Sequence, residues 1–210
     1  MRELREVLLA SASPRRLELL ASLGFRVMVV PSDVAEGDRP GYAPRELAGL
    51  HASAKADVAA SRDGSHVIVA ADTVVDVDGV ALGKPRDPGE ATAMLRLLSG
   101  REHLVHTAYA LVDGPSGRRL SGTESTRVRF HPLEPAEIDA YVASGDPFDK
   151  AGGYGIQGRG AALVAGIEGD FYTVMGLPLG AIIRRLPELG YKLQSNAGSR
   201  SGAAGTGPFT

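Results

Sequence analysis

The stretch VLLASASPRRLELL, residues 7–20, predicts a strand, a tight turn and the start of a helix in direct succession. Val7–Ala10 is an apolar run of the length expected for a short buried strand. Ser13 is a natural N-cap, and Pro14 is a natural first helical residue. Gly24 is then expected to end the helix. A strand that leads through a short turn into a helix is typical of α/β proteins.

Two arginines occupy the first turn of this predicted helix. Arg15 and Arg16 lie where the helix dipole carries positive partial charge, so cations are disfavoured there. A bound anion would offset that cost. We therefore expect the first-turn N–H groups, the Ser11 hydroxyl and both guanidiniums to converge on a phosphate. The alternative is a solvated pair of surface arginines.

Similar patterns predict the rest of the fold. Strands are expected at 25–31, 66–79 and 161–166, with two long antiparallel strands around a Gly-rich turn over 103–130. Helices are expected at 41–61, 87–100 and 134–145, with a last one beginning near Pro178. The order combines hairpins and crossovers, which predicts an α/β fold with a mixed sheet and flanking helices. The helix at 41–61 is predicted to bury the face formed by Leu47, Leu50, Ala54 and Val58.

Composition limits the class of protein. The chain has 210 residues, and we expect 1–194 to form one domain followed by a disordered Gly/Ser/Ala-rich tail at 195–210. A net charge of −2 argues against nucleic-acid or membrane-surface binding. The absence of cysteine excludes disulfides and thiol catalysis. No apolar stretch approaches a membrane span, and Val7–Ala10 is too short for a signal peptide, so we expect a cytoplasmic protein.

A carboxylate interrupts the apolar stretch VIVAADTVV, residues 67–75. Asp72 follows Val67–Ala71 and is predicted to lie at the end of a buried strand. A carboxylate there is costly unless it binds a cation or takes part in chemistry. The alternative is an aspartate that caps a turn, and Asp76 and Asp78 suit that role better.

Two glycine-rich stretches resemble phosphate-binding loops only in part. GVALGKP, residues 79–85, has the wrong spacing for a P-loop and ends in proline, but Lys84 remains as a point charge for phosphate. Residues 153–158 satisfy G-x-G-x-x-G, yet a polar loop precedes them and a strand-like run follows. A dinucleotide-binding oxidoreductase, which needs a strand before and a helix after, is therefore disfavoured. Lys150 and Gln157 instead suit close approach of this loop to a ligand.

The histidines do not predict a metal site. His103 and His106 lie three residues apart in a predicted strand, so their side chains point to opposite faces and cannot share a metal ion.

Taken together, LLASASPRR, VIVAADTVV, LGKP, ESTRVRF, DPFDKAGGYGIQG and GLPL resemble, in this order, the Maf family of nucleoside triphosphate pyrophosphatases. The resemblance implies a fold like that of inosine triphosphate pyrophosphatases, with two lobes around a cleft, and often a homodimer. It implies hydrolysis of a nucleoside triphosphate to monophosphate and pyrophosphate with a divalent metal, for which we expect Mg²⁺ or Mn²⁺. It also suggests a link to the arrest of cell division.

The resemblance assigns roles residue by residue. The active-site aspartate of the family falls on Asp72, and an acidic residue expected to share the metal falls on Glu36. The cationic positions fall on Arg15, Arg16, Lys55, Lys84 and Lys150, and the positions that select the base fall on Arg15, Thr73 and Gln157.

These assignments lead to a specific expected reaction. Asp72 would act either as general base on a water that attacks the α-phosphorus or as ligand of a metal that activates this water. Arg16 and Lys84, with the other cations, would stabilise charge on the leaving pyrophosphate. The Gln157 amide can pair with the N3–H and O4 of uracil or thymine, although it can also turn to fit cytosine and does not by itself exclude CTP. The resemblance implies the same choice, since the Maf subgroup with glutamine at this position favours dTTP and UTP, and we expect a preference for these two nucleotides. The competing hypothesis is a non-catalytic nucleotide-binding regulator of division.

Overall fold

A mixed sheet forms the centre of the computed structural model, which describes residues 1–32, 34 and 41–193. The strands follow the order β3-β2-β4-β6-β7-β8, and a short β5 pairs with β4. β2 runs parallel to β3 and β4, whereas β4, β6, β7 and β8 are joined antiparallel. Their bounds are β2 Glu6–Leu9, β3 Arg26–Val29, β4 Val67–Val77, β5 Val80–Leu82, β6 Glu102–Asp113, β7 Arg119–Phe130 and β8 Val164–Glu168. The predicted α/β class with a mixed sheet is confirmed.

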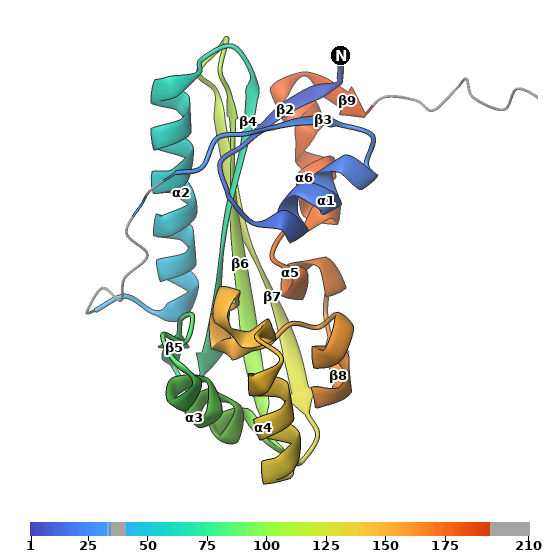
Figure 1. Ribbon diagram of the computed structural model, residues 1–210. Coiled ribbons are helices and arrows are strands. Elements are labelled where there is room, and N and C mark those ends of the chain that lie inside the picture. Colours follow the sequence, from blue (N-terminus) through green and yellow to red (C-terminus); the bar gives the residue numbers. More distant parts are fainter. Residues whose placement is uncertain (33, 35–40, 194–210) are drawn as a thin grey trace, which may run out of the picture.

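The long strand β4 has two covered faces, and its residues alternate between them. Ile68 and Ala70 pack in a cluster with Ala56 and Ala59 of α2 (Pro44–Arg62). The odd-numbered residues of the same strand, such as Val69, pack on the opposite face. Figure 1 shows α2 along one side of the sheet, with α1 and α6 on the other. Because both faces are buried, β4 is almost continuously apolar, and its polar residues stand out.

The buried face of α2 differs from the predicted one. Leu50, Ala54 and Val58 are only half-buried, whereas Leu47 is buried as expected. The residues facing the sheet are Leu47, Ala48, His51, Ala52, Lys55, Ala56 and Ala59. Most of them are small, so the helix lies close to β4 and β6, and the larger aliphatic side chains fall at its margins. The correction matters because it turns His51 and Lys55 toward the sheet.

The other face of the sheet carries two groups of elements. The first comprises α1 (Pro14–Ser22), α6 (Leu179–Arg185) and the parallel pair β1 (Arg2–Leu4) and β9 (Tyr191–Leu193). The second comprises α3 (Pro88–Leu98) and α4 (Pro135–Ala143), which pack on the far ends of β4, β6 and β7. Figure 1 shows these groups at opposite ends of the sheet. They correspond to the two lobes that the resemblance implied.

Some local features differ from the expectations. The strand predicted at 161–166 begins only at Val164, because 158–163 form a 3₁₀ turn. The short helix α5 (Phe171–Met175) and the β1–β9 pair were not predicted. Ser13 occupies the N-cap position of α1, but its side chain makes no capping hydrogen bond.

Two expectations concern residues outside the described ranges. The predicted tail at 195–210 and the candidate metal ligand Glu36 both lie there. In the part of the chain that is described, none of the helices has the length and apolar character needed to cross a membrane.

Candidate functional site

A cleft of about 1100 Å³ opens along one edge of β4. β2 pairs with β4 at Val67–Val69 and then leaves the sheet, whereas β5 begins to pair with the same strand only at Val75. Asp72 and Thr73 lie in the gap between these two partners. Asp72 is therefore in the middle of an 11-residue strand, rather than at the end of a strand as predicted. Ligands in α/β sheets commonly bind where a neighbouring strand ends, and this gap is such a place.

The lining of the cleft is strongly cationic, although the whole chain carries a net charge of −2. Three carboxylates also line it, those of Asp72, Glu90 and Asp149. The cationic side chains are Arg15, Arg16, Lys55, Lys84, Arg86 and Lys150. Such a local excess of positive charge attracts polyanions and raises their local concentration. Of the sequence-predicted residues, the cleft brings together Ser11, Arg15, Arg16, Lys55, Asp72, Thr73, Lys84, Lys150 and Gln157.

Two residues of α2 form hydrogen bonds with the carboxylate of Asp72. Lys55 Nζ donates to Asp72 Oδ1 at 2.6 Å, and His51 Nδ1 lies 3.1 Å from Oδ2. All three residues are only 4% exposed, so the carboxylate is nearly desolvated, and each of its oxygens has one donor. Positions 51 and 55 are one helical turn apart, which places both side chains on the same face. His51 was not predicted as a site residue.

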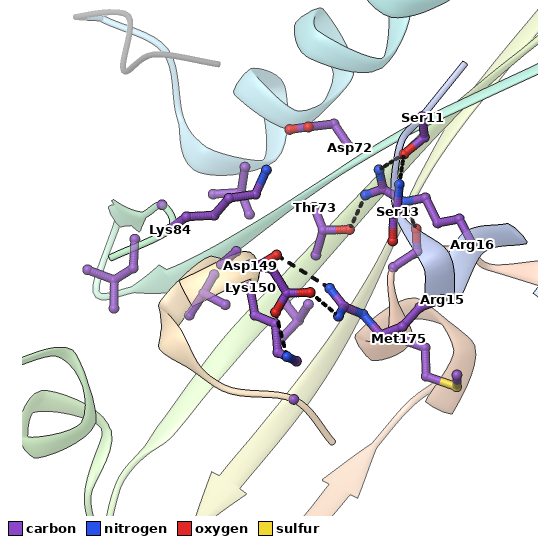
Figure 2. Close-up of a pocket in the computed structure, with 18 of the residues that line it drawn as sticks. Ser11, Ser13, Arg15, Arg16, Asp72, Thr73, Lys84, Asp149, Lys150 and Met175 are labelled. Atoms are coloured by element: carbon purple, nitrogen blue, oxygen red, sulfur yellow. Dashed lines mark hydrogen bonds and ion pairs between the residues drawn. The ribbon is translucent and has the colours of Figure 1, made fainter. Parts of the chain in front are cut away.

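Arg16 is built into the wall of the cleft. Its guanidinium donates to the Gly176 carbonyl at 2.8 Å, to Ser11 Oγ at 3.1 Å and to Thr73 Oγ1 at 3.1 Å. These acceptors belong to the turn after α5, the turn after β2 and the strand β4. Figure 2 shows the bonds to Ser11 and Thr73. Arg16 thus joins three segments that are distant in the sequence, in addition to lining the cleft as predicted.

The bond from Arg16 begins a chain of hydroxyl groups across the sheet. Thr107 Oγ1 donates to the Thr173 carbonyl at 2.6 Å, so its single hydrogen is used. Thr73 must therefore donate to Thr107, whose oxygen is 2.9 Å away. The chain fixes the side chain of Thr73 and connects it to α5. A residue predicted to help select the base is thus held in one orientation.

Arg15 points in a different direction from Arg16, toward the loop on the opposite side of the cleft. Its Nη1 donates to Asp149 Oδ2 at 2.7 Å, and Lys150 Nζ lies 2.5 Å from Oδ1 of the same carboxylate. Figure 2 shows Asp149 between the two cations. Partial burial raises the pKa of Asp149, but the hydrogen bonds from Lys150 and Arg15 outweigh it and lower the pKa overall. Asp149 therefore stays ionised, and its negative charge is paired with Arg15 and Lys150, two side chains that were predicted to contact phosphate.

The remaining predicted residues come from the loops. Lys84 follows β5, is exposed, and in Figure 2 extends toward the side of the cleft where Asp72 lies. The amide of Gly152 donates to the Gly83 carbonyl at 2.9 Å, which ties the Lys84 turn to the glycine-rich loop. Gln157 is exposed at the rim. A Cβ at Gly155 would lie 2.8 Å from Lys150 Cε, so glycine there makes room for the lysine stem.

The glycine-rich loop does not form a dinucleotide-binding turn. 3₁₀ turns at 146–149 and 151–153 precede it, and another 3₁₀ turn at 158–163 leads into β8. The loop therefore lacks the preceding strand and the following helix that such a site requires, as predicted.

The two histidines of β6 have separate surroundings, as their spacing predicted. His103 Nε2 lies 2.7 Å from the hydroxyl of Tyr154, and burial lowers the pKa of His103 to about 4. His106 instead contacts Ser125 and Asp76. Asp76 also accepts from the Gly79 amide at 2.8 Å, which is the turn-capping role expected for it.

The described residues of this site offer few protein ligands to a divalent metal ion. Within 1–32, 34 and 41–193, no group of three or more His, Asp or Glu side chains is placed to hold a metal ion. Asp72 is the carboxylate at the floor of the cleft, and one donor already occupies each of its oxygens. A carboxylate has about four acceptor sites, so it can still offer an oxygen to one ion. This suits Mg²⁺, which proteins often bind through one or two carboxylates together with substrate phosphates.

Comparisons with known proteins show the family of this chain. Residues 6–189 match the family model described as Maf-like protein. A dTTP/UTP pyrophosphatase of Carboxydothermus hydrogenoformans is 48% identical over 186 residues, which cover 89% of this chain and all of that protein. Proteins of the same name from Symbiobacterium thermophilum and Thermococcus gammatolerans are 46% and 47% identical, over 90% of this chain and 97% and 99% of theirs.

Among solved structures, the Ham1 protein of Staphylococcus aureus has a TM-score of 0.44 at 16% identity, covering 60% of this chain and 72% of that one. The family match, in contrast, spans nearly the whole described chain and includes every candidate site residue. The chain therefore belongs to the Maf-like protein family.

Proposed function

We propose that this protein hydrolyses dTTP and UTP to the corresponding monophosphate and pyrophosphate. The observation that carries the proposal is the cleft itself, in which six cationic side chains surround a buried, doubly hydrogen-bonded Asp72. Close relatives named dTTP/UTP pyrophosphatase match along their entire length or nearly so, which supports the choice of reaction and substrate.

The loop side of the cleft would bind the phosphates. Arg15 and Lys150 already hold one anionic group, the Asp149 carboxylate, which occupies the kind of position that a phosphate oxygen would take. A triphosphate carries more negative charge than a single carboxylate, so it can compete for these donors. Lys84 reaches the cleft from the turn after β5 and supplies a further point charge.

Asp72 would act at the reacting phosphorus. Water attacks the α-phosphorus, the bond between this phosphorus and the bridging oxygen breaks, and that oxygen leaves with the pyrophosphate. As general base, Asp72 would take the proton of the water on a lone pair that His51 and Lys55 do not use. As a metal ligand, Asp72 would instead offer the same lone pair to the cation. A metal titration of Asp72→Asn separates the two roles, because losing a ligand raises the metal concentration required, whereas losing a base lowers the rate at saturating metal.

A bound divalent cation, Mg²⁺ or Mn²⁺, would supply neutralisation of phosphate charge and a lower pKa of coordinated water. Asp72 would hold it together with the substrate phosphates, and Glu36 is the second protein ligand that the sequence suggests. The cations Arg15, Arg16, Lys84 and Lys150 would stabilise the pyrophosphate as its charge develops.

The nucleobase of the substrate would be recognised at the rim of the cleft. Gln157 is exposed there and can present an acceptor to N3–H and a donor to O4 of uracil or thymine. Arg15 and Thr73 would help to select the substrate from the opposite side of the cleft.

The test is a nucleotide panel with pyrophosphate detection, with and without Mg²⁺ or Mn²⁺. We expect metal-dependent pyrophosphate release, fastest with dTTP and UTP. Tight nucleotide binding without turnover would instead support a non-catalytic regulator of cell division. A cytoplasmic location and a homodimer belong to the same proposal, and light scattering in solution checks the dimer.

A further inference from the structure

His51 is a buried polar residue of the cleft for which the predicted mechanism has no role. It lies on α2, one turn before Lys55, and its ring nitrogen Nδ1 is 3.1 Å from Asp72 Oδ2. We propose that His51 is a positioning residue for Asp72, which fixes the plane of the carboxylate so that its remaining lone pairs face the cleft. This inference rests on the proposed function, because it assumes that Asp72 acts in the reaction.

The direction of the hydrogen bond follows from the chemistry of the pair. An ionised carboxylate only accepts hydrogen bonds, so Nδ1 must carry the hydrogen and donate it. Lys55 donates to the other oxygen, Oδ1, at 2.6 Å. The two oxygens therefore have different donors. A rotation of the carboxylate about its last side-chain bond would break or lengthen both hydrogen bonds.

The two donors restrain Asp72 to different degrees. The rotation of an aspartate carboxylate is intrinsically soft, with a broad and roughly two-fold profile. The ammonium of Lys55 is carried on a four-carbon stem that has more rotatable bonds than the side chain of His51. The imidazole of His51 is a rigid ring on a short stem, so its N–H is a fixed reference point.

The packing around His51 limits its movement as well. The ring is 4% exposed, and a cluster of small buried residues lies on the same face of the sheet, namely Ala48, Ala52, Val74 and Ala108. Densely packed interiors hold side chains in single rotamers. Asp72 is thus oriented by a side chain that is itself held in place, which is the arrangement that a reacting carboxylate requires.

The alternative is that His51 only fills space beneath the cleft. Two variants separate these roles. His51→Leu keeps an apolar side chain of similar bulk without the donor, whereas His51→Asn places an amide N–H close to the position of Nδ1. Ser53→Leu is the matched control, because Ser53 is exposed on the same helix.

We expect His51→Leu to lower kcat for dTTP by about 10-fold or more, the usual scale for losing the partner that orients a reacting ligand. KM should change by less than about 3-fold, because the phosphate contacts lie elsewhere, and His51→Asn should recover most of kcat. Ser53→Leu should match wild type. Equal losses in the Leu and Asn variants, or a wild-type kcat in His51→Leu, would overturn the proposal.

A double-mutant cycle tests whether His51 acts through Asp72. In single-turnover reactions with excess enzyme, His51→Leu should reduce the rate of Asp72→Asn by less than about 2-fold, because the group that it orients is already gone. Independent, multiplying losses in the double variant would contradict the assignment.

One further measurement does not depend on turnover. The hydrogen bond predicts a solvent-protected Nδ1–H proton signal from His51 in the NMR spectrum, which should be lost in Asp72→Ala. If the wild-type protein released no pyrophosphate while this signal was present, the proposed function would be wrong and the bond real. If the signal were absent from an active enzyme, the role of His51 would be wrong and the function would stand.

Discussion

The two sides of the cleft are built in opposite ways. The strand wall, which we define as Ser11, Arg16, His51, Lys55 and Asp72, consists of side chains that are at most 9% exposed and bonded to one another or to the backbone. The loop wall, which we define as Lys84, Asp149, Lys150 and Gln157, lies on turns, and three of its four side chains are exposed. Charged groups are thus fixed on one side and accessible on the other.

The adjacent residues Arg15 and Arg16 show what this difference means. Arg16 is buried and holds three chain segments together, while Arg15 reaches out to a loop carboxylate. Buried charges need fixed partners, because an unpaired charge is costly there, whereas exposed charges can exchange partners at little cost. The strand wall is therefore suited to orient the reacting groups, and the loop wall to bind and release a charged substrate.

The largest expected effect comes from the strand wall. Asp72→Asn keeps the shape of the side chain and removes its charge, so turnover of dTTP should fall by at least about 100-fold, the scale for losing a general base. Steady-state pyrophosphate release measures it, with circular dichroism as the control for folding. Turnover within a few-fold of wild type would remove Asp72 from the chemistry.

The two arginines should differ in stability as well as activity. Arg16→Ala leaves several buried acceptors without their donor, so the free energy of unfolding should fall by about 1–3 kcal/mol. Arg15→Ala breaks an exposed ion pair and should change it by no more than about 0.5 kcal/mol, while raising KM for the triphosphate. Urea denaturation compares the two variants. Equal stability losses would mean that the buried contacts of Arg16 and the exposed ion pair of Arg15 do not differ as described.

A smaller effect is expected at the rim of the loop wall. Gln157→Glu replaces an amide that can donate to O4 with a carboxylate that only accepts, so kcat/KM for UTP should fall by roughly 10-fold. Activity on GTP serves as the internal control and should not fall in parallel, because guanine presents N1–H and N2–H₂ as adjacent donors from which a carboxylate can accept. If UTP and GTP lost activity equally, Gln157 would act on the phosphates or the loop rather than on the base.

The smallest expected effect concerns how the loop wall is anchored. His103 hydrogen-bonds the buried Tyr154 of this loop, and burial lowers the pKa of His103 to about 4, from 6.5. Between these values the unfolded chain binds more protons than the folded one, so stability decreases as the pH falls. Because of His103, we expect the free energy of unfolding to fall by about 1 kcal/mol between pH 7 and pH 5.5. Denaturation at both pH values checks it, and His103→Gln should show a weaker dependence on pH.

Much of the strand wall could be predicted because its signals are local. The turn at Ser11–Arg16 follows from strand, cap and proline preferences, and Asp72 stands out within an apolar strand. His51 escaped prediction because it lies 21 residues from Asp72, and because the helix was expected to bury its larger aliphatic residues. The i, i+4 spacing of His51 and Lys55 was the available signal. It identifies a shared face, but only the packing of α2 shows that this face meets Asp72.

The loop wall was harder to predict in its geometry than in its composition. Lys84, Lys150 and Gln157 were identified as ligand contacts, but the ion pair of Asp149 with Arg15 depends on two segments 134 residues apart meeting across the cleft. The helix α5 is only five residues long, too short to show a helical period. Glu36, which lies outside the described residues, stays a prediction.

The central claim is that water attacks the α-phosphorus of a triphosphate held beside Asp72. Hydrolysis of dTTP in ¹⁸O-labelled water, with mass spectrometry of both products, tests it most directly. We predict that the label appears in dTMP and not in pyrophosphate, and that Asp72→Asn forms neither product at a comparable rate. Label in the pyrophosphate, or release of labelled orthophosphate with dTDP, would contradict the account.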